Sequence, residues 1–301
     1  MEQFFQQLTN GLAVGGIYAL IALGYTMVYG VMRLINFAHG DLFTLGAYLG
    51  MTILTTIALH SVLGLFLGIV VLALMVMGLV AIVGALLERT AYRPLRRSSR
   101  LSAVVSALGA SIVLQNAIML IYGARFQVYP QGILPRTAIT LFGLQIPLMR
   151  IVLFFTSGVL MIALYLFIQK TKIGTAIRAA AIDQGAARLM GIDVDRVILV
   201  VFLIGPALGG MAGLMVGLYY GQINFTMGWV YGLKAFTAAI LGGIGNIPGA
   251  MVGGILLGII EALGSGYISI AWKDAIAFLV LILILIVRPT GLLGERVAEK
   301  V

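Results

Sequence analysis

Residues 62–87 read VLGLFLGIVVLALMVMGLVAIVGALL, a run without a single charged side chain. A helix rises about 1.5 Å per residue, so about 20 apolar residues cross about 30 Å of bilayer hydrocarbon. The run is therefore long enough to span a membrane. Because it is continuously apolar and does not alternate with polar residues, it predicts a helix and not a barrel strand.

The composition extends this conclusion to the whole chain. Of the 301 residues, 61% are hydrophobic and 10% are charged, whereas soluble domains carry about 25% charged residues. In lipid, every backbone N–H and C=O group must find a partner inside the protein. We therefore expect an all-α integral membrane protein, a polytopic helical bundle that forms one transmembrane domain over residues 1–301.

Apolar runs predict eight or nine spans. The segment 229–241 is short for a full span and is a candidate half-helix, which is why the count stays open. The expected spans are residues 8–30, 42–59, 62–87, 101–122, 148–168, 197–220, 229–241, 248–263 and 267–287.

Most of the positive charge lies in two loops, residues 88–100 and 170–196. Cytoplasmic loops carry an excess of Lys and Arg, so both loops should face the cytoplasm. Counting back three spans from the first loop places the amino end outside, and Arg288, Arg296 and Lys300 place the carboxyl end inside. An outside start and an inside end require an odd number of crossings, which nine spans satisfy and a re-entrant segment 229–241 does not.

Several classes of function are disfavoured by the residues present. The chain has no cysteine and only two histidines, His39 and His60, so disulfides and thiolate chemistry are excluded and a metal site is not expected. The net charge of +9 lies between apolar runs, which indicates membrane topology and not nucleic-acid binding. No cluster of acid, base and nucleophile suggests an enzyme. No Gly-Lys dipeptide occurs, so no P-loop can hold ATP in this chain.

Glycine occurs 39 times, often at four-residue spacing, as in Gly205, Gly209, Gly213, Gly217 and Gly221. Small residues let helix backbones approach in lipid and gain van der Waals contact. We expect this ladder to pack against several helices inside the bundle, with a subunit interface as the alternative.

A pattern Ile-Asn-Phe-x-x-Gly occurs at 35–40 and again at 223–228. Corresponding glycine-interrupted positions in two halves of a chain indicate inverted repeats and a substrate path between them. The alternative is a polar surface turn, whose side chains cap free backbone groups. The candidate pathway residues are Asn36, His39, Asp41, Asn116 and Asn224.

Two charged residues also fall inside apolar runs, Lys234 and Glu261. Charged groups at membrane depth are costly and usually face a bundle interior or water. We expect structural roles for both, and Lys234 lies near enough to a helix start to extend its ammonium to the interface.

The second basic loop contains KIGTAIRAAAIDQGAARLMGID at 172–193. It predicts a short alanine-rich helix that Gly191 ends. Its small side chains would let it enter a groove of a partner protein, while a solvated loop would not need so many alanines.

This loop resembles the cytoplasmic coupling segment of ABC importer permeases, and we assign it to residues 170–196. The chain as a whole is similar to the branched-chain amino acid permease family, through 35–41 (INFAHGD), 178–191 and 241–249 (LGGIGNIPG). Arg178-Ala179 stands where the coupling pattern begins with an acidic residue. The resemblance implies contacts to an ATPase from Thr175, Arg178, Ala179, Ala180, Asp183, Ala187, Arg188 and Gly191.

The resemblance also implies a larger complex in a bacterial inner membrane. It would contain a second permease subunit in a heterodimer, two cytoplasmic ATPases that bind ATP and magnesium, and a periplasmic binding protein. This permease, of type II importer fold, would pass leucine, isoleucine or valine by alternating access and hold no cofactor of its own. Alternatives are a sugar or purine permease of the same superfamily, or an ion-coupled secondary transporter that uses Asp41 and Glu261.

Overall fold

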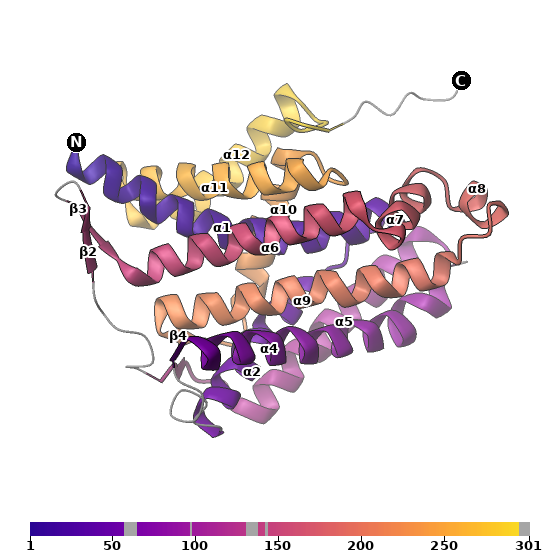
Figure 1. The fold of residues 1–301 in the computed structure, drawn as a ribbon, viewed down its shortest axis with the longest axis horizontal. Helices are drawn as coiled ribbons and strands as arrows, with labels where there is room; N and C mark the ends of the chain where they lie inside the picture. The colour runs from indigo at the N-terminus through magenta and orange to yellow at the C-terminus, as the bar shows by residue number, and fades with distance from the viewer. Residues whose placement is uncertain (57–64, 97, 131–137, 142–143, 295–301) are drawn as a thin grey trace.

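The computed structural model describes the chain except residues 57–64, 97, 131–137, 142–143 and 295–301. Long helices run side by side along one direction and form a single bundle (Figure 1). Their bounds are α1 (Glu2–Met32), α2 (His39–Thr56), α4 (Leu65–Leu87), α5 (Arg100–Tyr122), α6 (Leu148–Lys170), α9 (Val194–Tyr220), α10 (Met227–Gly242), α11 (Ile247–Tyr267) and α12 (Lys273–Val287).

Each of the nine expected spans overlaps one of these helices, so the helical fold is confirmed. Among the described residues, seven helices are long and apolar enough to cross a membrane. The other two are α2 and α10, with 18 and 16 residues. The expected half-helix 229–241 is thus α10, and α2 resembles it in length.

Two antiparallel helices, α1 and α9, form the centre of the bundle. Near one end, Tyr219 donates a 2.6 Å hydrogen bond to Asn10, and farther along Gly24 packs against Gly205. Helix α1 also contacts α6, α10 and α11, while α9 contacts α2 and α4. Most of both helices is buried, so the remaining spans are arranged around this pair.

Four members of the glycine ladder, Gly205 to Gly217, pack inside the bundle as the sequence predicts, whereas Gly221 caps the end of α9 and a Cβ there would meet nothing within 4 Å. A Cβ on Gly209 would meet His39, one on Gly213 would meet the Phe43 backbone, and one on Gly217 would meet Tyr129. The four-residue spacing drifts around the helix, since each step turns it by about 400°. One ladder therefore serves several neighbours.

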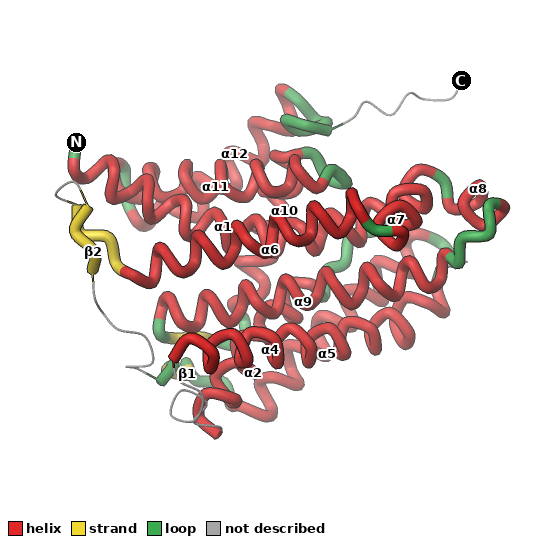
Figure 2. Tube along the Cα trace, in the orientation of Figure 1, coloured by secondary structure: helices red, strands yellow, loops and turns green. Residues whose placement is uncertain are grey.

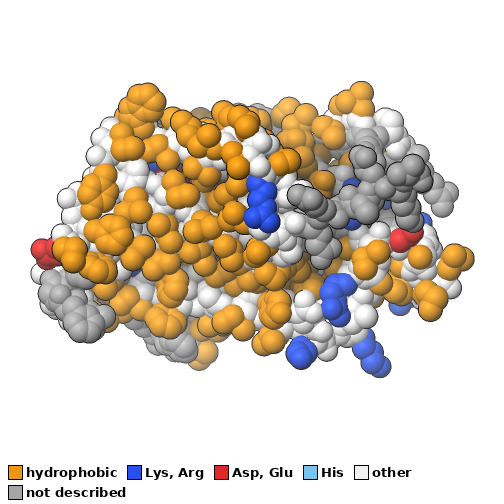
Figure 3. All heavy atoms as spheres, turned by 90° about the horizontal axis from the view of Figure 1, so that it is seen from above, with side chains coloured by type: hydrophobic (Ala, Val, Ile, Leu, Met, Phe, Trp, Pro, Cys, Tyr) orange, Lys and Arg blue, Asp and Glu red, His pale blue; other side chains and the backbone are white. Residues whose placement is uncertain are grey.

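The outer helices α5 and α12 leave most of their surface outside the bundle. In the view from above, hydrophobic side chains cover most of the visible face, and Lys and Arg lie from its middle to the right-hand end (Figure 3). An apolar outer surface with charge toward one end is what a bilayer requires.

Both basic loops lie at one end of the bundle, which we call the basic end. The first loop holds the π-helix η1 (Glu88–Tyr92) and the 3-10 helix η2 (Arg93–Leu95), and the second holds α7 (Lys172–Ile182) and α8 (Gln184–Leu189). Residues 292 and 293, which follow α12, hydrogen-bond to the last residues of α10. The shared location agrees with a cytoplasmic position for both loops.

Short strands cover the opposite end (Figure 2). Strands β2 (Ala138–Leu141) and β3 (Leu144–Pro147) form an antiparallel hairpin, and β1 (Gln127–Val128) pairs with β4 (Gln222–Ile223). The Tyr129 hydroxyl beyond β1 donates to the Ala47 carbonyl. Burial raises the pKa of Tyr129, so the side chain stays a neutral hydroxyl and fastens this loop to α2.

Candidate functional site

The first helix break joins α1 to α2. Helix α1 ends at Arg33, whose φ of 55° is left-handed and whose N–H bonds to Tyr29. The next helix begins at His39, whose Nε2 lies 3.2 Å from the carbonyl of Ile21. Since Ile21 lies about three turns before the end of α1, the chain folds back into the bundle before α2 begins.

The second break joins α9 to α10 in the same way. Helix α9 ends at Gly221 with a left-handed φ of 71°, where a residue without Cβ is favoured. The two breaks share one register, because Met32 and Tyr220 are 188 residues apart, as are His39 and Met227. The repeated motif is therefore repeated structure and not chance identity.

The last glycines of the two motifs meet inside the bundle. A Cβ on Gly40 would collide with the backbone of Gly228, and one on Gly228 would collide with the backbone of Gly40. Equivalent residues contact each other when they lie beside a pseudo-two-fold axis. The amino ends of α2 and α10 therefore meet inside the bundle. The two halves of the chain to which they belong run in opposite directions.

Helix contacts outside the motifs agree with this relation. Helix α1 packs on α11, and its counterpart α9 packs on α4. In the same way α10 packs on α1, and its counterpart α2 packs on α9. Because α1 and α9 run in opposite directions, the halves are inverted repeats, as the motif predicted. A central site between inverted repeats is where transporter pathways lie.

Three of the five candidate pathway residues gather at the first break. Asn36 is 1% exposed and accepts a 2.6 Å hydrogen bond from Tyr92. His39 is fully buried. The carboxylate of Asp41 accepts a 2.5 Å hydrogen bond from Ser111 of α5. The alternative of an exposed polar turn is therefore excluded for these side chains.

The other two candidates lie elsewhere. Asn116 is exposed on α5 and donates to the Ile112 carbonyl one turn earlier. Asn224 is half-buried beyond the far end of α9 and accepts from Thr226 at 3.2 Å. Among the described residues, neither forms a hydrogen bond with the buried cluster at the first break.

The first break also holds buried polar atoms without a hydrogen-bond partner in the described chain. These atoms are Asn36 Nδ2 and His39 Nδ1. An unpaired buried donor or acceptor costs about 1–3 kcal/mol. Such groups are concentrated where function requires a polar surface inside a protein.

A buried ion network lies in the second half of the chain. Lys234 of α10 is 3% exposed and lies 3.1 Å from Glu261 and 2.6 Å from Asp274. Glu261 also accepts from Lys273 at 3.0 Å and from Tyr18 at 2.9 Å. The structural role expected for Lys234 and Glu261 agrees with this geometry, in which the Lys234 ammonium is buried and joins α10 to α11 and α12.

The expected coupling helix is two helices with a break at Asp183. Thr171 caps α7, and the Asp183 carboxylate accepts from the N–H groups of Gly185 and Ala186 to begin α8. Gly191, with a φ of 82°, follows the end of α8. Asp183 thus interrupts a segment that its alanines alone would make continuous.

The candidate coupling residues divide between two faces of this segment. Ala180 and Ala187 are buried against the bundle, and Ala179 is half-buried. The exposed members are Thr175, Arg178, Asp183, Arg188 and Gly191. The alanines let the segment lie close to the bundle, while the exposed members lie on its outer surface.

The tip of the segment carries three apolar side chains that the motif did not single out. Ile182, Leu189 and Met190 are 86%, 89% and 82% exposed. Their sequence signal is a hydrophobic residue at the end of each short helix, in a loop that is otherwise polar or small. Exposed apolar side chains outside the bilayer indicate a protein contact.

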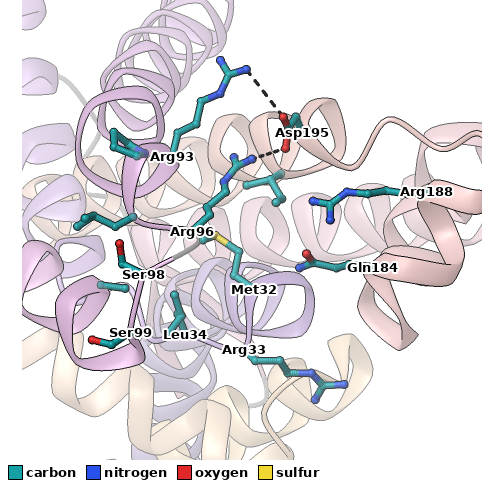
Figure 4. A pocket seen from close by; sticks show the side chains of 14 residues that line it. Met32, Arg33, Leu34, Arg93, Arg96, Ser98, Ser99, Gln184, Arg188 and Asp195 are labelled. Carbon is teal, nitrogen blue, oxygen red and sulfur yellow. Dashed lines mark hydrogen bonds and ion pairs between the residues drawn. The ribbon is translucent and has the colours of Figure 1, made fainter.

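Arg188 is exposed but does not lie at this tip. It lines a cavity at the basic end together with Arg33, Arg93 and Arg96 (Figure 4). Among the described residues, no group of His, Asp and Glu could hold a metal ion.

Comparison with known proteins assigns the family. Residues 7–285 match the family described as the branched-chain amino acid transport system permease component. The chain belongs to this family. It is 44% identical to the high-affinity branched-chain amino acid transport system permease protein LivH of Escherichia coli K12, over 99% of this chain and 98% of that protein. Identity to BraD of Pseudomonas aeruginosa, which carries the same description, is 44% with the same coverage.

A more distant member of the family comes from Methanocaldococcus jannaschii. It is a probable branched-chain amino acid transport permease protein LivH and is 30% identical over 95% of this chain and 91% of its own length. The family and the seven long apolar helices together make this chain a multi-pass protein of the inner membrane.

Proposed function

We propose that this chain is a transmembrane permease subunit of an ATP-binding cassette importer for branched-chain amino acids. The similarity to LivH and BraD over nearly the full chain supports the substrate class. The observation that carries the coupling role is the exposed apolar tip of α7 and α8 at the basic end. ATP would be bound and hydrolysed by two separate cytoplasmic ATPases.

The tip is suited to transmit motion to the bundle. Beyond the tip, the segment is anchored, because Ile177, Ala180 and Ala187 are buried and Gln184 donates a 2.7 Å hydrogen bond to the Val31 carbonyl at the end of α1. A partner that moves the tip would therefore move the end of α1 beside the first break. This link connects ATPase closure to the candidate pathway.

The first break is proposed as part of the pathway. Asn36, His39 and Asp41 supply neutral and acidic polar groups at depth, and the amino ends of α2 and α10 add partial positive charge. A zwitterionic amino acid needs a few such dipoles and apolar walls for its side chain. A second permease subunit would complete the pathway, and a periplasmic binding protein would deliver the substrate to the opposite end.

The secondary-transporter alternative is less well supported. Glu261 lies within 3.1 Å of two lysine ammonium groups, so its charge is already balanced and cannot easily serve a coupling ion. Asp41 alone would have to carry that role.

The coupling role is tested with Leu189→Asp and Arg178→Glu in the importer reconstituted in liposomes with its ATPases and binding protein. We expect at least tenfold lower ATP-driven leucine uptake, or loss of the ATPases during purification. The matched control is Arg196→Glu, because Arg196 is exposed at the same end, outside the candidate coupling set, and pairs with Asp193. Full uptake by both test variants with the ATPases retained would exclude the assignment.

A further inference from the structure

A cavity of about 750 Å³ lies at the basic end, where several elements meet. One wall is formed by Met32 at the end of α1 with Arg33 and Leu34, which follow it, and another by residues 93–96 and 98–99 of the first basic loop. Gln184 and Arg188 of α8 and the first turn of α9 complete it. Figure 4 shows Arg188 extending toward this space from the α8 side and Arg96 crossing it toward Asp195.

The lining of this cavity is strongly positive. Among the described lining residues, four arginines against one aspartate leave a net charge of +3. Arg96 lies 2.6 Å and Arg93 lies 3.8 Å from Asp195, and Arg96 also pairs with Glu88. Within the described chain, no carboxylate lies within 4.0 Å of Arg33 or Arg188. No carboxylate therefore balances either charge, and Arg33 donates one 3.1 Å hydrogen bond to the Ala181 carbonyl.

Uncharged donors add to this preference. Ser99 lines the cavity and is the N-cap of α5, a helix of 23 residues, so the positive end of its dipole lies at the cavity wall. Ser98 and Gln184 supply further polar groups. Guanidinium groups and a helix amino end together suit a phosphate.

An apolar track begins beside the cavity. On α5, Leu101, Val105 and Ile112 are 72%, 59% and 60% exposed, and their spacing places them along one face of the helix. Leu101 follows Ser99 by two residues, so this face starts at the cavity wall and continues into the bilayer. A bound molecule can place an anionic group in the cavity and hydrocarbon along α5.

We propose that this cavity binds the headgroup of an anionic glycerophospholipid, with the acyl chains along α5. A free phosphate would use the arginines but not the apolar track. An acidic segment of a partner ATPase would approach from the cytoplasm and leave the track uncovered. Basic pockets between spans on the cytoplasmic side of membrane proteins are suited to such headgroups.

The test measures lipid retention by native mass spectrometry of the assembled importer, extracted in mild detergent from membranes of phosphatidylethanolamine and phosphatidylglycerol. We expect retained phosphatidylglycerol on the unmodified protein. In the variant Arg33→Gln/Arg188→Gln, retention should fall at least about tenfold, because each arginine near an anionic lipid surface contributes a several-fold factor.

The matched control is Lys172→Gln/Arg196→Gln, which removes the same charge from the same end at two exposed residues that do not line the cavity. It should retain phosphatidylglycerol. The variant Arg33→Lys/Arg188→Lys should keep much of the lipid retention. That result would show that Arg33→Gln/Arg188→Gln has not lost lipid through misfolding. Added inorganic phosphate at millimolar concentration should displace little lipid.

Three results would overturn the proposal: equal lipid retention in both double variants, equal retention of zwitterionic and anionic lipid, or full displacement by phosphate. Loss of the ATPases from Arg33→Gln/Arg188→Gln with its lipid retained would assign the cavity to a protein partner. Because the readout is bound lipid, it is independent of uptake and of the amino acid transported.

Discussion

The two helix-break-helix units, α1–α2 and α9–α10, have the same register and opposite directions, yet different polar groups hold them in place. At the first break the buried polar groups are Asn36, His39 and Asp41, and their partners are hydroxyl and carbonyl groups. The second break is half-exposed, and its helix α10 is held instead by the ion network around Lys234.

The difference separates two roles within one repeated architecture. Neutral hydrogen bonds are worth about 0.5–1.5 kcal/mol each, and those to a charged group such as the Asp41 carboxylate about 1.5–3 kcal/mol, so the first break can exchange partners at lower cost than an ion network. A buried ion pair costs several kcal/mol to break, so α10 is fixed to α11 and α12. We infer that the first unit provides the pathway surface and the second unit its rigid support.

The largest effect is expected where the two units touch. Gly40→Leu or Gly228→Leu should each abolish assembly, since the added Cβ meets the backbone of the opposite motif. Overpacking normally costs about 1–3 kcal/mol, and backbone atoms on both sides leave little room to relax. The yield of monodisperse importer after size-exclusion chromatography measures the effect.

The control for this pair is Gly158→Leu, because a Cβ on Gly158 of α6 meets nothing within 4 Å. It should give normal yield. If only one of the two motif glycines were sensitive, the pseudo-two-fold contact would be wrong.

The next effect is expected in the ion network of the second unit. Lys234→Met leaves Glu261 with one fewer cation at depth and should destabilise the protein by about 3–5 kcal/mol. Lys234→Met/Glu261→Met should recover much of that loss, because Lys273 and Asp274 then remain as a balanced pair. Thermal unfolding of the purified importer gives the comparison.

An exposed lysine supplies the control. Lys172→Met, at the start of α7, removes the same charge from an exposed position and should change stability by less than about 1 kcal/mol. A double variant no more stable than Lys234→Met would contradict a pairwise role for Lys234 and Glu261.

Much of this fold follows from the sequence, because membrane spans are read from long apolar runs. The repeated Ile-Asn-Phe-x-x-Gly motif also indicated the inverted halves, and its glycines proved to be the contact between them. Glycine is informative here because only a residue without Cβ permits backbone contact at that point.

Other features depend on tertiary contacts that no local pattern contains. The pairing of Lys234 with Glu261 and Asp274 joins three helices, so neither residue reveals its partners from its own neighbours. Asn116 and Asn36 are both Asn residues near or within apolar runs, yet one is exposed and the other buried. The division of α7 from α8 depends on the Asp183 side chain, whose capping contacts outweigh the helix propensity of the alanines around it.

The smallest effect compares the two equivalent asparagines, Asn36 and Asn224. Asn36→Ala leaves the Tyr92 hydroxyl buried without its acceptor and should cost about 1–3 kcal/mol, whereas Asn224→Ala, at a half-exposed site, should cost less than about 0.5 kcal/mol. Asn36→Ala/Tyr92→Phe should regain part of the lost stability, because both members of the hydrogen bond are then removed. Leucine uptake, measured below the unfolding temperature of every variant, should remain low in this double variant if Asn36 lines the pathway, and should recover with stability if Asn36 only supports the fold. Equal uptake losses at the two asparagines would remove the distinction between a pathway unit and a supporting unit.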